Sequence, residues 1–387
     1  GHSVDLNGDG TILAVGTKND SHKTIIYKYD SGSWSLYGNT IDNQVSYELP
    51  IVTTTVVATS GQQIGDDIGV DSTAPFGVAM SSDGNIIAMG APYSDDNGNN
   101  SGSTFVFQRD TSNTTTSPIG WTQIGTLIGG EAASDESGDT IAINSDGSII
   151  AIGAAKNASN GYRSGHVRIW QRDTNATIGW TQIGQDIIGE AAADNSKHVA
   201  LSSDGHTVAI GAYENDATTA YSTTGHVRVW KYDGTSWNQI GQDIDGVDST
   251  DQFGGYNVAL SSDGTIVAAG SPRHDNFKGH VRVFLYNGVD AWNQLGPDID
   301  GPTDATTLAG YGVALSSDGT IVALGGSPNS GYVGSVSVYQ YDNPGSTGGS
   351  WNQLGNAILG DEAGSKWGRC LALSSDGTIL AASAPEY

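Results

Sequence analysis

Cysteine is nearly absent from this chain, and long apolar segments are missing altogether. Cys370 is the only cysteine among 387 residues, so no disulfide bond can form within the chain. That count is compatible with a location inside or outside the cell. No run of 18 apolar residues occurs, and we therefore expect no insertion into a membrane.

Basic residues are also scarce. Lys and Arg number 16 against 42 Asp and Glu, which gives a formal net charge of −26. A field of this sign repels the phosphates of nucleic acids and anionic membrane surfaces, so we expect neither as a partner. It favours solubility and weak binding of cations.

Helical periodicity is missing throughout the sequence, and a long repeat stands in its place. Glycine is abundant, at 55 residues, as expected for many tight turns. A hairpin of the type seen at Val258–Pro272, with Ser-Ser-Asp-Gly at its turn in most copies, occurs seven times. Its Asp-Gly pairs begin at Asp9, Asp83, Asp146, Asp204, Asp263, Asp318 and Asp376.

Each unit of the repeat predicts four antiparallel strands. The unit around Asp263 contains apolar segments at 256–260 and 265–270, a Gly-His-Val-Arg-Val-Phe segment at 279–284 and a Trp-led segment at 292–296. Repeated about seven times, such units predict an all-β fold, a seven-bladed β-propeller of four-stranded antiparallel blades that forms one domain over residues 1–387. The units span approximately residues 1–75, 76–138, 139–196, 197–254, 255–310, 311–367 and, in part, 368–387.

Two units depart from the common pattern. The first contains additional residues, 42–62, which we interpret as an inserted hairpin or a long excursion on the rim. The seventh stops at Tyr387, just after its second strand, so we expect the seventh blade to be incomplete in this chain. We therefore expect that the native polypeptide continues past Tyr387, or that upstream sequence has been removed.

The frame around each hairpin resembles the FG-GAP repeat. Phe76-Gly77 precedes one hairpin and Gly90-Ala91-Pro92 follows it, while Phe253-Gly254 and Gly270-Ser271-Pro272 repeat the frame. The resemblance covers nearly the whole chain. It implies a propeller like that of integrin alpha-chain heads, and it says less about function, because one fold supports many activities.

In the FG-GAP family, some repeats bind calcium through a loop patterned Asp-x-Asn/Asp-x-Asp-Gly-x-x-Asp. Asp5, Asn7 and Asp9 match the first part of this pattern, so the resemblance implies a candidate Ca²⁺ site there. Leu13 stands where the last acidic ligand belongs, and a plain turn remains the alternative. In the other six units the first position is alanine, and we expect no metal in those loops. These alanines are Ala79, Ala142, Ala200, Ala259, Ala314 and Ala372.

Two sets of repeated side chains favour packing between blades over binding. The first set pairs a histidine with an arginine two residues later, on one face of the third strand. Its members are His166 with Arg168, His226 with Arg228, and His280 with Arg282. We expect each pair to make the same structural contact, with the arginine bound to an aspartate, although a ring of histidines also suggests metal binding or pH sensing. The second set is the fourth-strand tryptophans, which we expect in the core: Trp121, Trp180, Trp237, Trp292 and Trp351.

Acidic loops return the chain from each fourth strand to the next unit. We expect them to cluster at one end of the propeller as solvated loops, with binding of cations or of a basic partner as the alternative. Their acidic residues include Asp135, Glu136, Asp194, Asp251 and Asp304. Five sequons in predicted loops offer N-glycosylation sites if the source is eukaryotic and secretory, although five are expected by chance. They are Asn19, Asn99, Asn113, Asn157 and Asn175.

These observations favour a binding function. No catalytic elbow, metalloprotease motif or phosphate loop occurs, so we predict that the chain is not an enzyme, with a glycan-active enzyme as a minor alternative. We predict an extracellular or cell-surface recognition or adhesion propeller that binds a protein or glycan through loop aromatics. These aromatics are Tyr93, Tyr162, Tyr213, Tyr221, Phe277 and Tyr332. The alternative is a structural subunit of an extracellular filament, sheath or matrix, which self-associates through the open edge of the incomplete blade.

Overall fold

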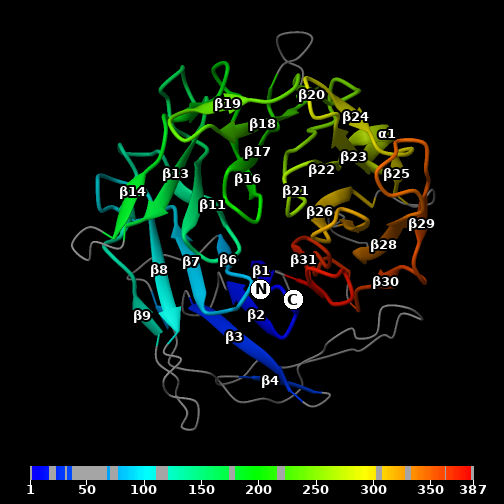
Figure 1. Ribbon diagram of the computed structural model, residues 1–387, viewed down its shortest axis with the longest axis horizontal. Helices are drawn as coiled ribbons and strands as arrows, with labels where there is room; N and C mark the ends of the chain where they lie inside the picture. The colour runs from blue at the N-terminus through cyan, green and yellow to red at the C-terminus, as the bar shows by residue number, and fades with distance from the viewer. Residues whose placement is uncertain are drawn as a thin grey trace.

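The computed structural model shows a ring of β-sheets around a central axis (Figure 1). It describes residues 2–16, 23–30, 33–36, 68–69, 77–109, 121–173, 179–215, 223–301, 307–326, 333–361 and 363–384. The predicted insertion at 42–62 lies outside these residues. Within the described part of the chain, helix is limited to α1 (His274–Phe277), and no helix has the length and apolar character that a membrane span requires.

The blades are built from radially arranged strands. The innermost strands, which line the axis, are β1 (Ser3–Leu6), β6 (Val78–Met80), β11 (Ser137–Ile143), β16 (Ser196–Leu201), β21 (Val258–Leu260), β26 (Ala309–Leu315) and β31 (Leu371–Leu373). The second strands are β2 (Ile12–Gly16), β7 (Ile86–Ala91), β12 (Ile149–Ala154), β17 (Thr207–Ala212), β22 (Ile266–Ser271), β27 (Ile321–Gly326) and β32 (Leu380–Ala382).

Three sets of strands form the outer part of the blades. The third strands are β3 (Lys23–Asp30), β8 (Ser103–Arg109), β13 (His166–Arg172), β18 (His226–Tyr232), β23 (His280–Tyr286) and β28 (Ser335–Tyr341). The fourth are β4 (Ser33–Leu36), β9 (Trp121–Gln123), β14 (Trp180–Gln182), β19 (Trp237–Gln239), β24 (Trp292–Gln294) and β29 (Trp351–Gln353). The fifth are β5 (Ile68–Gly69), β10 (Ile128–Gly129), β15 (Ile187–Ile188), β20 (Ile244–Asp245), β25 (Ile299–Asp300) and β30 (Ile358–Leu359).

The predicted all-β propeller is confirmed, but the numbers of blades and strands were wrong. The described residues form six blades rather than seven, and β31 with β32 makes only a two-stranded sheet at the seventh position, where an incomplete blade was expected. Each complete blade has five strands rather than four. The extra strand arises because the fourth strand is short: β14 pairs with residues 170–172 of β13, which leaves residues 166–167 to pair with β15.

The seven hairpin turns are joined into a closed ring of backbone hydrogen bonds. The amide of Ser262 donates to the carbonyl of Ser317 at 2.8 Å, and the same bond repeats from turn to turn. In the seventh hairpin, the amide of Ser375 donates to the carbonyl of Gly8 in the first, also at 2.8 Å. The seventh hairpin therefore occupies its place in the ring even though its sheet is small.

Side-chain hydrogen bonds explain why each turn contains serine and aspartate. The Asp263 carboxylate accepts from the Ser261 hydroxyl at 2.7 Å and from the Thr265 amide at 3.0 Å. Burial acts to raise the pKa of Asp263, but these bonds outweigh it and lower the pKa. Gly264 has a φ of +73°, a left-handed conformation in which a side chain is strained.

The second strands carry most of the core. Every residue of β7, β12, β17 and β22 is buried. A Cβ atom on Gly211 of β17 would overlap the carbonyl oxygen of Gly254 in the next blade, and one on Gly270 of β22 would overlap that of Gly310. A glycine one residue before the end of these second strands therefore allows neighbouring blades to pack closely.

Candidate binding face and inter-blade histidine sites

One end of the propeller, which we call the loop face, carries two kinds of loop. In the described residues they are the connections from second to third strands (92–102, 155–165, 213–215, 223–225 and 272–279) and the returns from fifth strands (130–136, 189–195, 246–252, 301 and 307–308). Backbone hydrogen bonds join the two kinds. The amide of Ala193 donates to the carbonyl of Tyr162 at 2.7 Å, and that of Leu308 donates to the carbonyl of Phe277 at 2.9 Å.

Three of the aromatic residues predicted to bind a partner are exposed on the loop face. The exposed fractions are 41% for Tyr93, 74% for Tyr162 and 47% for Phe277. Tyr221 and Tyr332 lie outside the described residues. Tyr213 is half-buried and its ring lies 6.1 Å from that of Tyr256, so it belongs to the mouth of the central channel instead.

The central channel has a volume of about 530 Å³ and is lined by the innermost strands. Five of its lining residues lie at or near the ends of the inner strands that point to the loop face, and we call this group the channel mouth: His198, Tyr213, Tyr256, Tyr311 and Arg369. The rings of Tyr256 and Tyr311 lie 4.0 Å apart, and the Arg369 guanidinium lies 5.8 Å from the Tyr311 ring. Burial, helped by the Lys197 charge, lowers the pKa of His198 to about 3, so this imidazole is neutral at pH 7.

The predicted histidine–arginine pairs lie in three sites between blades, which we name after His166, His226 and His280. In the His226 site, the Nδ1 atom lies 3.8 Å from Glu190 and 3.9 Å from Asp243. Arg228 donates to the carbonyl of Ile188 at 3.1 Å and lies 3.4 Å from the Glu190 carboxylate. Glu190 and Ile188 belong to the preceding blade and its return, so the site joins two blades.

The His166 site repeats this arrangement. The Nδ1 atom of His166 and the guanidinium of Arg168 each lie 3.7 Å from Glu131. Arg168 also donates to the carbonyl of Gly129 at 2.8 Å. The expected structural contact is therefore present in both sites, although the acidic partner of the arginine is a glutamate and the closest bond is to a backbone carbonyl.

Burial keeps the three imidazoles neutral near pH 7. It lowers the pKa of His166 to about 4, and the neighbouring Arg168 acts in the same direction. Burial and Arg228 likewise lower the pKa of His226 to about 4. Burial, with the charge of His274 as the next cause, lowers the pKa of His280 to about 4. Neutral imidazole is the form that binds metal ions.

The acidic returns differ from the solvated loops that we expected. Asp135, Asp194 and Asp251 are buried, with exposed fractions of 4%, 2% and 0%. Each carboxylate accepts a backbone amide of its own loop, as in the 2.8 Å bond from Ala191 to Asp194. These three residues therefore shape their returns, because a buried carboxylate requires such partners. Glu136 forms an ion pair with Lys156 at 2.6 Å, and Asp304 lies outside the described residues.

The other side of each buried aspartate receives a side chain from the neighbouring second-to-third-strand loop. Asn157 donates to Asp135 at 3.2 Å, and Asn215 donates to Asp194 at 3.4 Å. Asn157 was also a predicted glycosylation site, but its side chain is buried and occupied by this bond. Asn99 is exposed, whereas Asn19, Asn113 and Asn175 lie outside the described residues.

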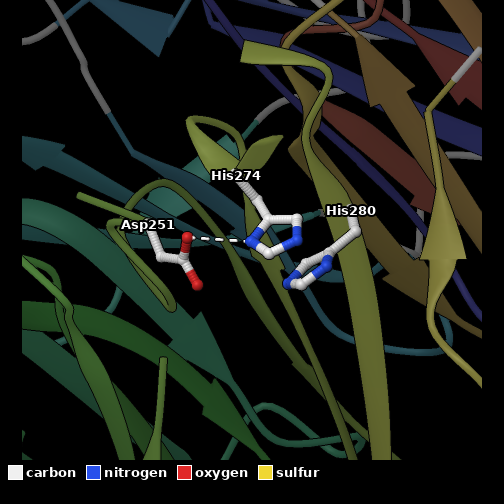
Figure 2. A group of neighbouring side chains, drawn as sticks. All are labelled: Asp251, His274 and His280. Atoms are coloured by element: carbon white, nitrogen blue, oxygen red, sulfur yellow. Dashed lines mark hydrogen bonds and ion pairs between the residues drawn. The ribbon is translucent and has the colours of Figure 1, made fainter. Parts of the chain in front are cut away.

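In the His280 site, two residues of this pattern are exchanged. Val247 stands at the position of Glu190, and His274 of α1 stands at the position of Asn215. The Nδ1 atom of His274 lies 3.0 Å from Asp251, and its ring stacks 4.0 Å from that of His280 (Figure 2). Sequence reasoning missed His274, although its place three residues after the end of β22 matches that of Asn157 after β12 and Asn215 after β17.

The remaining arginine also has different neighbours in the His280 site. Arg282 donates to the carbonyl of Asp245 at 2.5 Å, as its counterparts donate to theirs. Its guanidinium lies 4.4 Å from the ring of Phe253, which occupies the position of Ser196. Where the other sites have a glutamate beside the arginine, this site therefore has a cation–π contact between Arg282 and Phe253.

The Asp5 loop has the hydrogen bonds of an ordinary hairpin turn. Asn7 accepts from the Ile12 amide at 2.7 Å and Asp9 accepts from the Thr11 amide at 2.9 Å, in the manner of Ser261 and Asp263. Asp5 accepts from the amides of Leu6 and Met80, the second in the next blade. Calcium binding by Asp5, Asn7 and Asp9 stays a prediction.

Three of the five fourth-strand tryptophans lie in the core, as predicted, whereas Trp121 and Trp351 are half-buried. Trp180, Trp237 and Trp292 are almost fully buried. Their indole nitrogens donate to backbone carbonyls of the preceding blade, as in the 2.9 Å bond from Trp237 to Ile183. Trp351 makes the same bond to Leu295 at 2.7 Å.

Comparisons with known proteins agree with this architecture. A solved structure of Kuenenia stuttgartiensis hydrazine synthase is similar to 98% of this chain and 94% of its own, with a TM-score of 0.56 and 14% sequence identity. At that identity the likeness concerns the fold alone. The comparison with curated proteins found no match. Residues 69–107 match the FG-GAP repeat family. The match and the propeller fold together confirm the predicted resemblance to FG-GAP repeat β-propellers.

Proposed function

We propose that this chain is a recognition propeller that binds a protein or a glycan at the cell surface or outside the cell. The observation that carries the proposal is the exposure of Tyr93, Tyr162 and Phe277 on separate loops of one face. Exposed aromatic side chains on loops held by a rigid scaffold are favoured contact residues, because they offer a large apolar area with little loss of conformational freedom.

The channel mouth adds a second element to the same face. Tyr213, Tyr256 and Tyr311 come from different blades and form a half-buried aromatic group beside Arg369. Rings and a guanidinium together suit the apolar faces and hydroxyl groups of a sugar, or a side chain of a protein partner. We therefore propose that the peripheral loop aromatics and the tyrosines and arginine of the channel mouth act together in recognition.

The propeller fold fits a recognition role or a structural role. We favour recognition because the loop aromatics differ from blade to blade, whereas residues that join the blades repeat. Repeated positions such as the tryptophans serve packing, and a partner that reads one face needs the positions that vary.

The proposal is tested by probing arrays of glycans and of extracellular proteins with the whole chain and its variants. Tyr162→Ala combined with Phe277→Ala should weaken binding at least about tenfold, since a few aromatic side chains usually carry most of the binding energy of an interface. Val289→Ala is the control, because Val289 is 77% exposed in the turn between third and fourth strands at the opposite end. Absence of any partner on both arrays, or equal loss with Val289→Ala, would contradict the proposal.

A further inference from the structure

We propose that the His280 site binds a divalent transition-metal ion of the zinc class between His274 and His280. On the side of His274, Asp251 ligates the ion or positions that imidazole, and on the side of His280, Asp298 and Asp300 offer oxygen ligands. The ion would link the second-to-third-strand loop of one blade to the return from the preceding blade.

The first observation is the convergence of donor atoms from separate segments. Asp251 comes from a return, His274 from α1 and His280 from β23, and their ligand atoms lie within 4.8 Å of one another (Figure 2). His280, Asp298 and Asp300 form a second such group that shares His280. Two imidazoles with carboxylates are a typical donor set for zinc, whereas calcium prefers oxygen ligands alone.

The second observation is an unsatisfied imidazole. The His280 side chain is 0% exposed, and neither of its ring nitrogens has a hydrogen-bond partner. A buried polar group without a partner is costly, and coordination of an ion by one nitrogen would remove that cost. The His166 imidazole is also unsatisfied, but within the described residues no second imidazole stacks against it.

A carboxylate already holds the second histidine in place. Asp251 lies 3.0 Å from the Nδ1 atom of His274 and also accepts the amides of Val247 and Asp248. A carboxylate on one ring nitrogen orients an imidazole so that its other nitrogen faces a metal. Asp251 thus either ligates the ion directly or positions His274, and both roles depend on the same buried carboxylate.

The His280 site differs from the other two in the partner of its arginine. In the His226 site, Glu190 lies 3.4 Å from Arg228, so the carboxylate that would bind an ion is paired with a cation. In the His280 site, Arg282 lies against the Phe253 ring. Asp248 lies 3.4 Å from the Nδ1 atom of His274, and Asp298 lies 3.5 Å from that of His280. Lys278 is paired with Asp275. Within the described residues no ion pair joins Arg282 to Asp251 or Asp298, although its charge acts on both from a longer distance. Asp251 and Asp298 therefore lack the close cationic partner that Glu190 has.

The site also has an entry path. The His274 side chain is 20% exposed and α1 is a single turn on the loop face. Tetrahedral zinc ligands lie about 3.3 Å from one another, given metal–ligand bonds of about 2.0 Å. Binding would therefore draw the donor atoms closer, and the exposed turn that carries His274 is the segment that can move.

The test is titration of the metal-free whole chain with Co²⁺, followed by displacement with Zn²⁺. Tetrahedral Co²⁺ absorbs visible light strongly, so its spectrum reports the ligand set directly. We expect one equivalent to bind at the site and Zn²⁺ to displace it. His274→Asn should weaken binding by more than about 100-fold, because even the partners of metal ligands change affinity by about 10–100-fold.

Asparagine is the informative replacement because the chain uses it at this position in two other loops. Asn157 and Asn215 bind their buried aspartates as His274 binds Asp251, so the variant should keep the fold, which circular dichroism checks. His226→Gln is the matched control and should leave Co²⁺ affinity unchanged. The proposal is overturned if the wild-type chain takes up no ion, if His274→Asn binds as the wild type does, or if His226→Gln loses as much affinity.

Discussion

The His226 and His280 sites occupy equivalent positions between successive blades, and they differ in a few side chains. Both contain a buried histidine and an arginine that donates to a backbone carbonyl of the preceding blade. In the His226 site, a glutamate pairs with the arginine. In the His280 site, the arginine instead lies over an aromatic ring, and a second histidine stacks against His280. The shared scaffold holds the blades together, and the exchanged residues decide what else the site can do.

The largest expected effect concerns Phe253, which is present only in the His280 site. Its ring is fully buried, and it contacts Arg282 and packs edge-on against Phe284 at 6.2 Å. Phe253→Ser introduces the residue found at position 196 and should lower the free energy of unfolding by about 3–5 kcal/mol, as expected for removal of a buried phenylalanine. Chemical denaturation measures this change, and Ser196→Ala is the control. A loss below 1 kcal/mol would show that Arg282 does not depend on the ring.

A smaller effect is expected from pH in the His166 site. Its native pKa of about 4 lies below the value of 6.5 that an unfolded histidine has, so the unfolded chain binds the proton first as the pH falls. The stability contributed by the neutral imidazole is complete above pH 6.5 and is lost toward pH 4. The shift corresponds to on the order of 3 kcal/mol.

His166→Gln should therefore flatten the decrease in unfolding free energy between pH 7 and pH 4.5. Denaturant titrations at both values measure it. His206→Gln replaces a histidine whose side chain is 45% exposed, and it controls for the substitution itself. An unchanged slope in His166→Gln would mean that the buried imidazole does not resist protonation.

The smallest change in stability is expected when the His280 site is converted into a copy of the His226 site. Val247→Glu with His274→Asn restores the glutamate and the asparagine of the other sites. Because Val247 is 61% exposed, the new ion pair with Arg282 should alter the free energy of unfolding by only about 1 kcal/mol or less. Denaturation at low and high salt measures this effect. A loss of several kcal/mol would show that the two sites are not interchangeable.

The sequence predicts most of the scaffold. The Asp-Gly hairpins, the tryptophans and the histidine–arginine pairs are regular, so their spacing indicates which residues share a face and join blades. The fifth strand was missed because Ile187–Ile188 is too short to show a pattern, and it forms only because β14 leaves part of β13 unpaired.

The sequence predicts much less of the candidate sites. The sequence pattern assigned Asp251 to a solvated loop. Its burial was missed because it depends on hydrogen bonds from backbone amides of the same return, which the sequence does not reveal. Tyr213 was grouped with exposed loop aromatics, yet it packs beside Tyr256 at the channel mouth. His274 lies in a loop without periodicity, and only alignment with Asn157 and Asn215 singles it out.

The most direct test of the proposed difference between the sites is anomalous diffraction at the zinc edge from crystals of the whole chain grown with equimolar Zn²⁺. The account predicts one strong anomalous peak between His274 and His280, and no peak beside His166 or His226. A peak of equal height in all three sites, or none between His274 and His280, would contradict it.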